Sequence, residues 1–288
     1  MAATELLTTK VRSDGLGLRR LFRSLGLLDR FALFVLFALV LVAIFAPLVA
    51  PHDPTVPAGP PLSAPAKGFW FGTDQIGYDI LSRVVFGLRA SLVGAFVVIL
   101  SGVVIGGLIG LTAGALGGWV DSALMRLTDV FLALPAPLLA IAVVAAIGPG
   151  FGHTLLAVAI VWWPWYARIV RGEITALRHR PQTEAAKLSG ISRRRIWFRH
   201  LLPGALPAVL VLATLDVGGL ILMLAGLSFL GLGAPAPAPE LGAMSAQGLR
   251  FLLSSWWIPI VPAAFVAVLA FVANLVGDGI RDLMGSME

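Results

Sequence analysis

The stretch that decides the fold runs from Glu184 to Pro203 and reads EAAKLSGISRRRIWFRHLLP. Its beginning predicts a short helix over residues 183–188, because Glu, Ala and Lys are good helix formers and Thr183 can cap the first turn. Gly190 is expected to end this helix. After the glycine, arginines stand beside Ile, Trp, Phe and Leu, a composition typical of a segment that lies along an anionic membrane surface. The stretch therefore predicts a helix-turn-helix loop on the cytoplasmic side of a membrane.

The composition of the whole chain also indicates a membrane protein. Of its 288 residues, 58% are hydrophobic and 12% are charged, and the mean hydropathy is +0.94. Soluble domains carry about 25% charged residues, so a soluble globular protein is excluded. The absence of cysteine excludes disulfides and thiolate metal sites. The net charge of +6 is poor evidence for nucleic-acid binding, because no soluble basic domain exists to present a patch.

Uncharged stretches long enough to cross a membrane recur along the chain, since about 20 helical residues span a 30 Å hydrocarbon core. An even number of spans places both termini on one side. Seventeen of the twenty-one Lys and Arg residues then fall in cytoplasmic segments if the N-terminus is inside. We therefore expect an all-α membrane protein with six transmembrane helices and cytoplasmic termini. The spans are expected at residues 31–51, 90–120, two within 130–167 that turn at Gly148-Pro149-Gly150, 205–232 and 259–277.

Small residues and prolines mark special positions within these spans. Glycines recur every fourth residue in the second span and predict a smooth face on which another helix can pack closely. The prolines of the 134–137 stretch and Pro164 can each remove a backbone hydrogen bond and kink a helix. The glycines are Gly102, Gly106, Gly110, Gly114 and Gly118.

The segment after the first span is rich in Pro, Ala and Gly over residues 51–68, which favours extended backbone. It is followed by FGTDQIGYDILSR at residues 71–83. Here Thr73 or Asp74 is expected to cap a helix that carries Ile76, Ile80 and Leu81 on one face.

The decisive stretch resembles the EAA loop of permease subunits of ABC importers, and we place this loop at residues 171–204. One departure from the family pattern is His200, where an apolar residue is usual. Residues 71–83, 165–173, 227–244 and 275–282 resemble the peptide and nickel group of these permeases, and in particular the second permease subunit of such systems. The EAA match rests on Glu184, Ala185, Ala186, Gly190, Leu202 and Pro203.

The resemblance implies a type I importer permease in the bacterial inner membrane. Its partners would be a homologous permease subunit, two ABC ATPase subunits, an extracytoplasmic substrate-binding protein and membrane lipid, with dipeptides or short oligopeptides as substrates. The implied organisation is a cytoplasmic segment at 1–30, the first helix and outer loop at 31–90, a five-helix core at 91–282 and a tail at 283–288. The loop residues implied to couple to the ATPase are Glu184, Ala185, Ala186, Leu188 and Gly190.

Catalytic chemistry is not expected in this chain. None of its three lysines follows a glycine, so the phosphate-binding loop of an ATPase is missing. The four histidines are far apart and do not have metal-ligand spacing. We therefore expect no cofactor or metal here, and expect ATP and Mg to be used by the partner ATPases.

Asp216 is the one ionisable residue well inside a predicted span. An acid at such a depth costs about 2.5–3.5 kcal/mol on insertion scales unless it faces protein or water. It is a candidate pathway residue that attracts the ammonium group of a passing peptide. The alternative is a structural hydrogen bond to a neighbouring helix.

Three other functions compete with peptide import. A permease for nickel or another small solute would share the same scaffold motifs. A secondary transporter or channel would need several ionisable groups in mid-membrane or broken helices in inverted repeats. An intramembrane aspartyl protease could use Asp129 and Asp216, but the Gly277-Asp278 pair lacks the preceding glycine of such enzymes.

Overall fold

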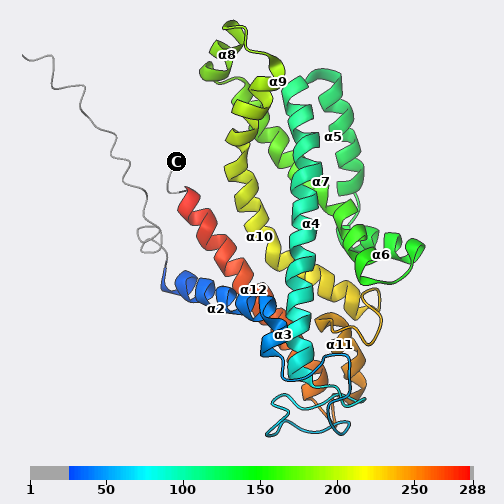
Figure 1. Cartoon of the computed structure of the whole chain (residues 1–288). Helices are drawn as coiled ribbons and strands as arrows, with labels where there is room; N and C mark the ends of the chain where they lie inside the picture. The colour runs from blue at the N-terminus through cyan, green and yellow to red at the C-terminus, as the bar shows by residue number, and fades with distance from the viewer. Residues whose placement is uncertain (1–25, 286–288) are drawn as a thin grey trace, which may run out of the picture.

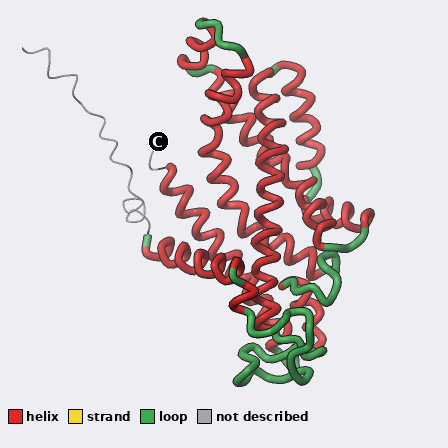
Figure 2. The backbone as a smooth tube through the Cα atoms, viewed as in Figure 1, coloured by secondary structure: helices red, strands yellow, loops and turns green. Residues whose placement is uncertain are grey.

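The computed structural model describes residues 26–285, and within this range it is helical with no β-strand. Residues 1–25 and 286–288 lie outside the described residues, so the predicted N-terminal segment and tail fall largely there. Figures 1 and 2 show the helices and their connecting loops. The elements are α2 (Leu27–Ile44), α3 (Ala46–Val49), α4 (Ile80–Leu116), α5 (Gly118–Leu132), α6 (Ala136–Ile147), α7 (Phe151–Arg178), α8 (Pro181–Leu188), α9 (Arg193–Ile196), the π turn η1 (Trp197–Leu201), α10 (Leu202–Phe229), α11 (Leu241–Gly248), the 3₁₀ turn η2 (Leu249–Phe251) and α12 (Trp257–Gly285).

Four of the described helical stretches are long and apolar enough to cross a membrane, or five if the bent α5–α6 pair counts as one span. The four are α2, α4, the continuous stretch from α9 through α10, and α12. The remaining expected span corresponds to α7, which has 28 residues and carries charged residues toward its C-terminal end. The all-helical membrane fold is therefore confirmed, while six spans and cytoplasmic termini remain predictions.

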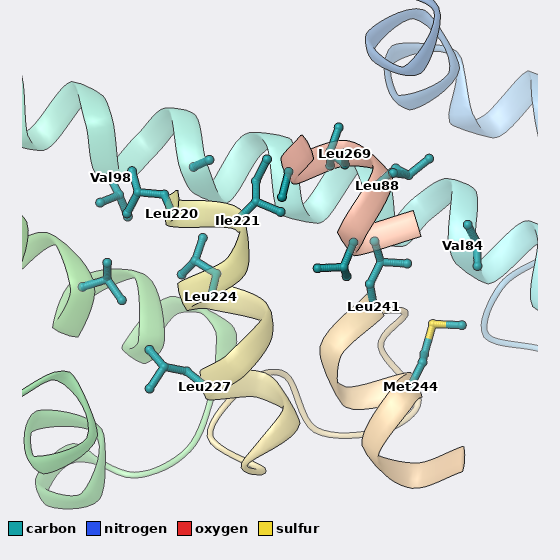
Figure 3. Packing of buried hydrophobic residues seen from close by; sticks show 14 of the residues in the cluster. Val84, Leu88, Val98, Leu220, Ile221, Leu224, Leu227, Leu241, Met244 and Leu269 are labelled. Atoms are coloured by element: carbon teal, nitrogen blue, oxygen red, sulfur yellow. The ribbon is translucent and has the colours of Figure 1, made fainter. Parts of the chain in front are cut away.

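The main hydrophobic core lies where α4, α10, α11 and α12 meet (Figure 3). Leu88 of α4 and Leu220 and Ile221 of α10 are at most 1% exposed. α7 lies along α4 and contributes Val158 and Val161 to the same cluster. Because these helices are apolar on several faces, they can pack on each other and still present hydrophobic side chains to lipid.

The third predicted span is broken. α5 ends at Leu132 and α6 begins at Ala136 with an 83° bend between them. Pro135 stands at the start of α6, where its missing N–H costs no helical hydrogen bond. The proline stretch therefore ends one helix and starts another. The predicted turn at residues 148–150 is confirmed, because α6 stops at Ile147 and α7 starts at Phe151.

The predicted cap at Thr73 or Asp74 is wrong. α4 begins at Ile80, and its N-cap is Asp79, whose carboxylate accepts a hydrogen bond from the Ser82 N–H at 3.0 Å. Asp74 instead accepts from the backbone N–H groups of Ile76 and Tyr78, at 2.9 and 3.0 Å, which holds a turn. Local sequence could not rank these acids, because each is a good capping residue.

Residues 50–79, called the 50–79 loop below, form a hydrogen-bonded loop at the end of the molecule opposite α8 (Figure 1). Its two halves pair through the Leu62 N–H and Asp74 carbonyl, at 2.9 Å, and the Thr73 N–H and Ser63 carbonyl, also at 2.9 Å. The indole of Trp257 donates to the Thr73 carbonyl at 3.2 Å. This last bond joins the loop to the start of α12.

The glycine-rich face of α4 lies against α7. A Cβ placed on Gly110 would lie 2.5 Å from the Ala167 carbonyl, and one on Gly114 would lie 2.9 Å from the Arg171 carbonyl. Gly102 and Gly106 likewise face Tyr166. The expectation for Gly118 is wrong, since α4 ends before it and no neighbour lies within 4 Å of a Cβ placed there.

Candidate functional site

The candidate coupling helix is α8, which spans Pro181–Leu188. Thr183 does not cap it as expected. Arg180 is the N-cap and Pro181 the first helical residue, a position that suits proline. The hydroxyl of Thr183 instead donates to the Leu177 carbonyl at 2.9 Å, so it ties α8 to the end of α7.

The C-terminal end of α8 has the geometry of a Schellman motif. The Gly190 N–H donates to the Lys187 carbonyl at 3.0 Å, and the Ile191 N–H donates to the Ala186 carbonyl at 3.2 Å. Gly190 has a φ of +74°, a conformation that side-chain-bearing residues rarely adopt. The glycine is thus needed for backbone conformation and not for close contact, because a Cβ there would meet nothing within 4 Å.

The predicted coupling residues divide between two faces of α8. Ala186 is half-buried and packs with Ile191 against a cluster formed by α4, α7 and α10. Glu184 and Ala185 are exposed, and Leu188 is 90% exposed. Pro181, Ala185 and Leu188 are spaced at i, i+4 and i+7, so they share one face. α8 therefore presents an uncovered apolar stripe bordered by charge.

Charged side chains brace the base of this loop. Arg171 of α7 forms a bidentate pair with Asp121 of α5, with distances of 3.0 and 2.6 Å. Arg168, also of α7, pairs with Asp129 of α5 at 2.5 Å. Arg178 donates to the carbonyls of Gly114 and Ala115 at the end of α4, where a cation complements the helix dipole. The last residues of α7, which lead into α8, are thereby held against α4 and α5.

The helix expected at residues 205–232 begins earlier in the structure, within the segment that follows Gly190. α9 begins at Arg193 and continues through η1 directly into α10. Its arginines are exposed, while Ile196 and Leu201 are at most 3% exposed and join the loop's cluster. The segment is therefore the start of the next long helix, which is joined to α8 by the turn at residues 189–192.

Asp216 lies on α10 and accepts a hydrogen bond from the indole of Trp162 on α7 at 2.9 Å. This bond supplies the structural contact that the sequence left as one of two alternatives. Asp216 is only partly buried, and the buried hydroxyl of Tyr166 is a second polar group near it. A role in a substrate pathway stays a prediction.

The structure also shows polar residues that sequence reasoning missed. Glu240, which precedes α11, is 5% exposed and accepts hydrogen bonds from the Ser228 hydroxyl and from the Ala234 N–H. Burial raises the pKa of Glu240 above its usual value, and the two hydrogen bonds partly oppose this shift. The lone acid in an otherwise Pro- and Ala-rich stretch was the available signal. For Arg178 the sequence likewise predicts only a cytoplasmic position, whereas the structure gives it two backbone acceptors on α4.

Within residues 26–285, no group of three or more His, Asp or Glu side chains is arranged to hold a metal ion. Asp129 and Asp216, the pair considered for proteolysis, are engaged separately with Arg168 and Trp162. The candidate functional features are thus the exposed face of α8, the ion pairs and hydrogen bonds that hold the end of α7 beside it, and the Asp216–Trp162 hydrogen bond.

Known proteins are similar to this chain in sequence and in fold. Residues 106–286 match a family model described as "Binding-protein-dependent transport system inner membrane component". The probable D,D-dipeptide transport system permease protein DdpC of Escherichia coli (strain K12) is 41% identical over 251 residues, which cover 87% of this chain and 84% of that protein. The nickel transport system permease protein NikC of the same strain is 39% identical, covering 88% of this chain and 92% of that protein.

A solved structure shares the fold at lower sequence identity. It is that of the MetNI methionine ABC transporter in inward-facing conformations, with a TM-score of 0.55 and 21% identity. The match covers 71% of this chain and 97% of that chain. The all-α, type I importer permease architecture expected from the sequence is thereby confirmed. The chain belongs to the family of inner membrane components of binding-protein-dependent transport systems, as a multi-pass permease subunit of an ABC importer of the peptide and nickel group.

Proposed function

We propose that this chain is one of two permease subunits of an ATP-driven importer that moves dipeptides or short oligopeptides into the cytoplasm. The mechanism rests on the exposure of α8. Backbone hydrogen bonds fix the C-terminal end of this helix, and its face with Ala185 and Leu188 is not covered by any described residue of the chain. The substrate class is supported by the relatives, whose names include dipeptide transport. The permease itself catalyses no reaction, and ATP and Mg act in separate ATPase subunits.

In this proposal an ATPase subunit receives α8 in a groove. The apolar stripe of Pro181, Ala185 and Leu188 is buried there, and Glu184 and Lys187 border it with opposite charges 3.8 Å apart. Movement of the ATPase displaces α8, and α7 and α10 carry the displacement into the membrane, because α8 connects to both through short ordered turns. A second, homologous permease completes the substrate path, and a substrate-binding protein delivers peptide at the opposite end.

Asp216 is proposed as a polar group on that path. Its carboxylate accepts one hydrogen bond from Trp162 and keeps accessible surface. Asp216→Asn retains an acceptor for the indole but removes the charge that would attract a peptide ammonium group. We expect slower uptake with normal assembly. Unchanged uptake rates with the full-length subunit at wild-type abundance would remove Asp216 from the path.

A nickel or other small-solute importer is the second candidate. The nickel permease relative is 39% identical to this chain, close to the 41% of the D,D-dipeptide relative. Both candidates use the same coupling loop, so the loop does not decide between them. The deciding experiment is a substrate test.

The test is mild-detergent purification of the chain from its native membrane, with mass identification of the co-purifying proteins and ATPase assays. Recovery of a second permease, ATPase subunits and a binding protein, with hydrolysis stimulated by dipeptides, is the expected result. Stimulation by Ni²⁺ and not by dipeptides would replace the peptide assignment. Recovery of the chain alone, with no ATPase, would overturn the coupling role of α8.

A further inference from the structure

A cavity of about 460 Å³ lies between α8, α9 and the adjoining ends of α4 and α7. No acidic side chain among the described residues lines it. Its lining combines the basic side chains of Arg178, His179, Lys187 and Arg193 with an apolar wall that includes Leu116 and Trp197.

The positive charge of this cavity is only partly used by the protein. Arg178 donates through Nη1 to two backbone carbonyls, and Lys187 donates to the Arg178 carbonyl at 3.3 Å. Glu184 lies 3.8 Å from Lys187, but it is exposed and does not line the cavity. Arg193 forms no ion pair with any described residue. Arg193 thus remains a cation without an acidic partner beside an apolar wall, next to the partly engaged Arg178 and Lys187.

We infer that this cavity binds the phosphate group of an anionic membrane phospholipid. A phosphate offers several acceptor oxygens, which suit convergent guanidinium and ammonium donors. Anionic lipids are enriched at the cytoplasmic surface, the side to which the Lys and Arg distribution assigns this loop. Leu116 at the cavity wall is 45% exposed, so an acyl chain can contact an apolar side chain beside the headgroup.

The cavity lies beside the Ala185 and Leu188 face that the ATPase is proposed to cover, and Lys187 borders both. Thr183 and Lys187 are four residues apart and point into the cavity, whereas Ala185 and Leu188 lie on the other side of α8. A bound headgroup would therefore contact α8, α9 and α7 together without covering the docking face. Lipid composition would then act on the stiffness of the coupling loop.

The test compares two double variants that remove the same charge. Lys187→Gln with Arg193→Gln removes two cavity cations, while Arg194→Gln with Arg195→Gln removes two exposed cations that lie outside the cavity. Each full-length chain is purified in detergent, depleted of lipid and titrated with dioleoylphosphatidylglycerol or dioleoylphosphatidylcholine. Bound lipid is counted by native mass spectrometry, and the thermal unfolding midpoint verifies folding.

We expect one tightly retained phosphatidylglycerol in the wild type and in the Arg194/Arg195 variant. Its affinity should be at least about tenfold weaker in the Lys187/Arg193 variant, because charge-assisted hydrogen bonds are lost. Equal loss in both variants, or loss in neither, would overturn the cavity as the site. Displacement of the lipid by millimolar inorganic phosphate, with phosphate alone giving the same protection against unfolding, would assign the site to free phosphate and overturn the lipid.

Discussion

At one end of the molecule several polar residues of the 50–79 loop and of its junction with α4 are buried, whereas at the other end the coupling helix is exposed. Thr73, Asp79 and Ser82 are at most 1% exposed, but Leu188 of α8 is 90% exposed. In the first region each of these side chains has an internal hydrogen-bond partner. In the second, the internal bonds hold only the ends of α8.

This difference separates motif residues that stabilise the fold from motif residues that remain exposed for a partner. Substitution in the 50–79 loop should act on folding, because buried pairs such as the Thr73 hydroxyl with the Pro60 carbonyl lose a partner when one group is removed. Substitution on the open face of α8 should act on function, because that face contributes little to the fold of the isolated chain. Single substitutions in the two regions test this distinction.

Gly77→Ala should destabilise the protein most. Gly77 has a φ of +93°, and a Cβ there would overlap the Gly59 carbonyl oxygen. We expect the free energy of unfolding to fall by at least about 3 kcal/mol, from backbone strain plus the clash. The measurement is the thermal unfolding midpoint and the monodisperse yield in detergent.

Gly68→Ala is the matched control for that variant. Gly68 has a similar φ of +101°, but a Cβ there meets nothing within 4 Å. It should cost about 1–2 kcal/mol, the price of the left-handed conformation alone. Equal losses at both positions would show that close approach of the loop's two halves is unimportant.

Leu188→Asp should reduce uptake by at least about tenfold without changing the unfolding midpoint. The side chain is 90% exposed, so its loss leaves no cavity in the isolated chain. The aspartate would lose the apolar contact with the ATPase groove and would place a charge in it, which together should weaken docking by about 2 kcal/mol or more. The assay is substrate uptake by the reconstituted complex, with Leu188→Met as the control that keeps activity. Normal uptake with Asp would contradict the docking face.

Gly190→Ala should have a smaller effect on the same assay. Alanine has room at this position but must adopt a φ of +74°, which costs about 1–2 kcal/mol and loosens the end of α8. We expect uptake to fall a few-fold. Gly190→Asn should recover part of it, since asparagine tolerates this conformation. If Ala and Asn behave alike, the Schellman geometry does not matter for coupling.

Glu240→Gln should have the smallest effect, visible mainly in the pH dependence of stability. Burial raises the pKa of Glu240, so the folded state binds this proton more tightly than the unfolded state. The free energy of unfolding therefore falls as pH rises from the usual pKa of 4.5 toward the folded pKa, and this contribution is constant above it.

The glutamine variant keeps hydrogen-bonding groups for Ser228 and the Ala234 N–H but has no proton to lose. Its unfolding midpoint should change less between pH 5 and pH 7.5 than that of the wild type. An unchanged slope would mean that the buried carboxyl does not titrate in this range.

Much of the architecture was predictable because hydrophobic length and charge are local properties. The long apolar helices, the 148–150 turn and the α4 glycine face that meets α7 all follow from residue type and spacing. The 83° break between α5 and α6 was not, because a proline stretch is compatible with either a kink or a complete interruption.

The candidate site was predictable in the same uneven way. Gly190 ends α8 as expected, since local backbone conformation demands it. Thr183 and Arg178 received their roles only from packing. Thr183 donates a hydrogen bond to the Leu177 carbonyl across the turn from α7 to α8. Arg178 donates to the Gly114 carbonyl at the end of α4, 64 residues away in the sequence.

By itself, then, the sequence determined that this is a multi-pass helical membrane protein with a basic connection between two of its helices. Those properties depend on transfer free energies and helix propensities that each segment carries alone. Tertiary structure decided which polar residues are satisfied internally and which remain open to a partner. That outcome depends on the neighbours each side chain meets, such as Trp257 at Thr73, Arg178 at the end of α4 and open space at Leu188.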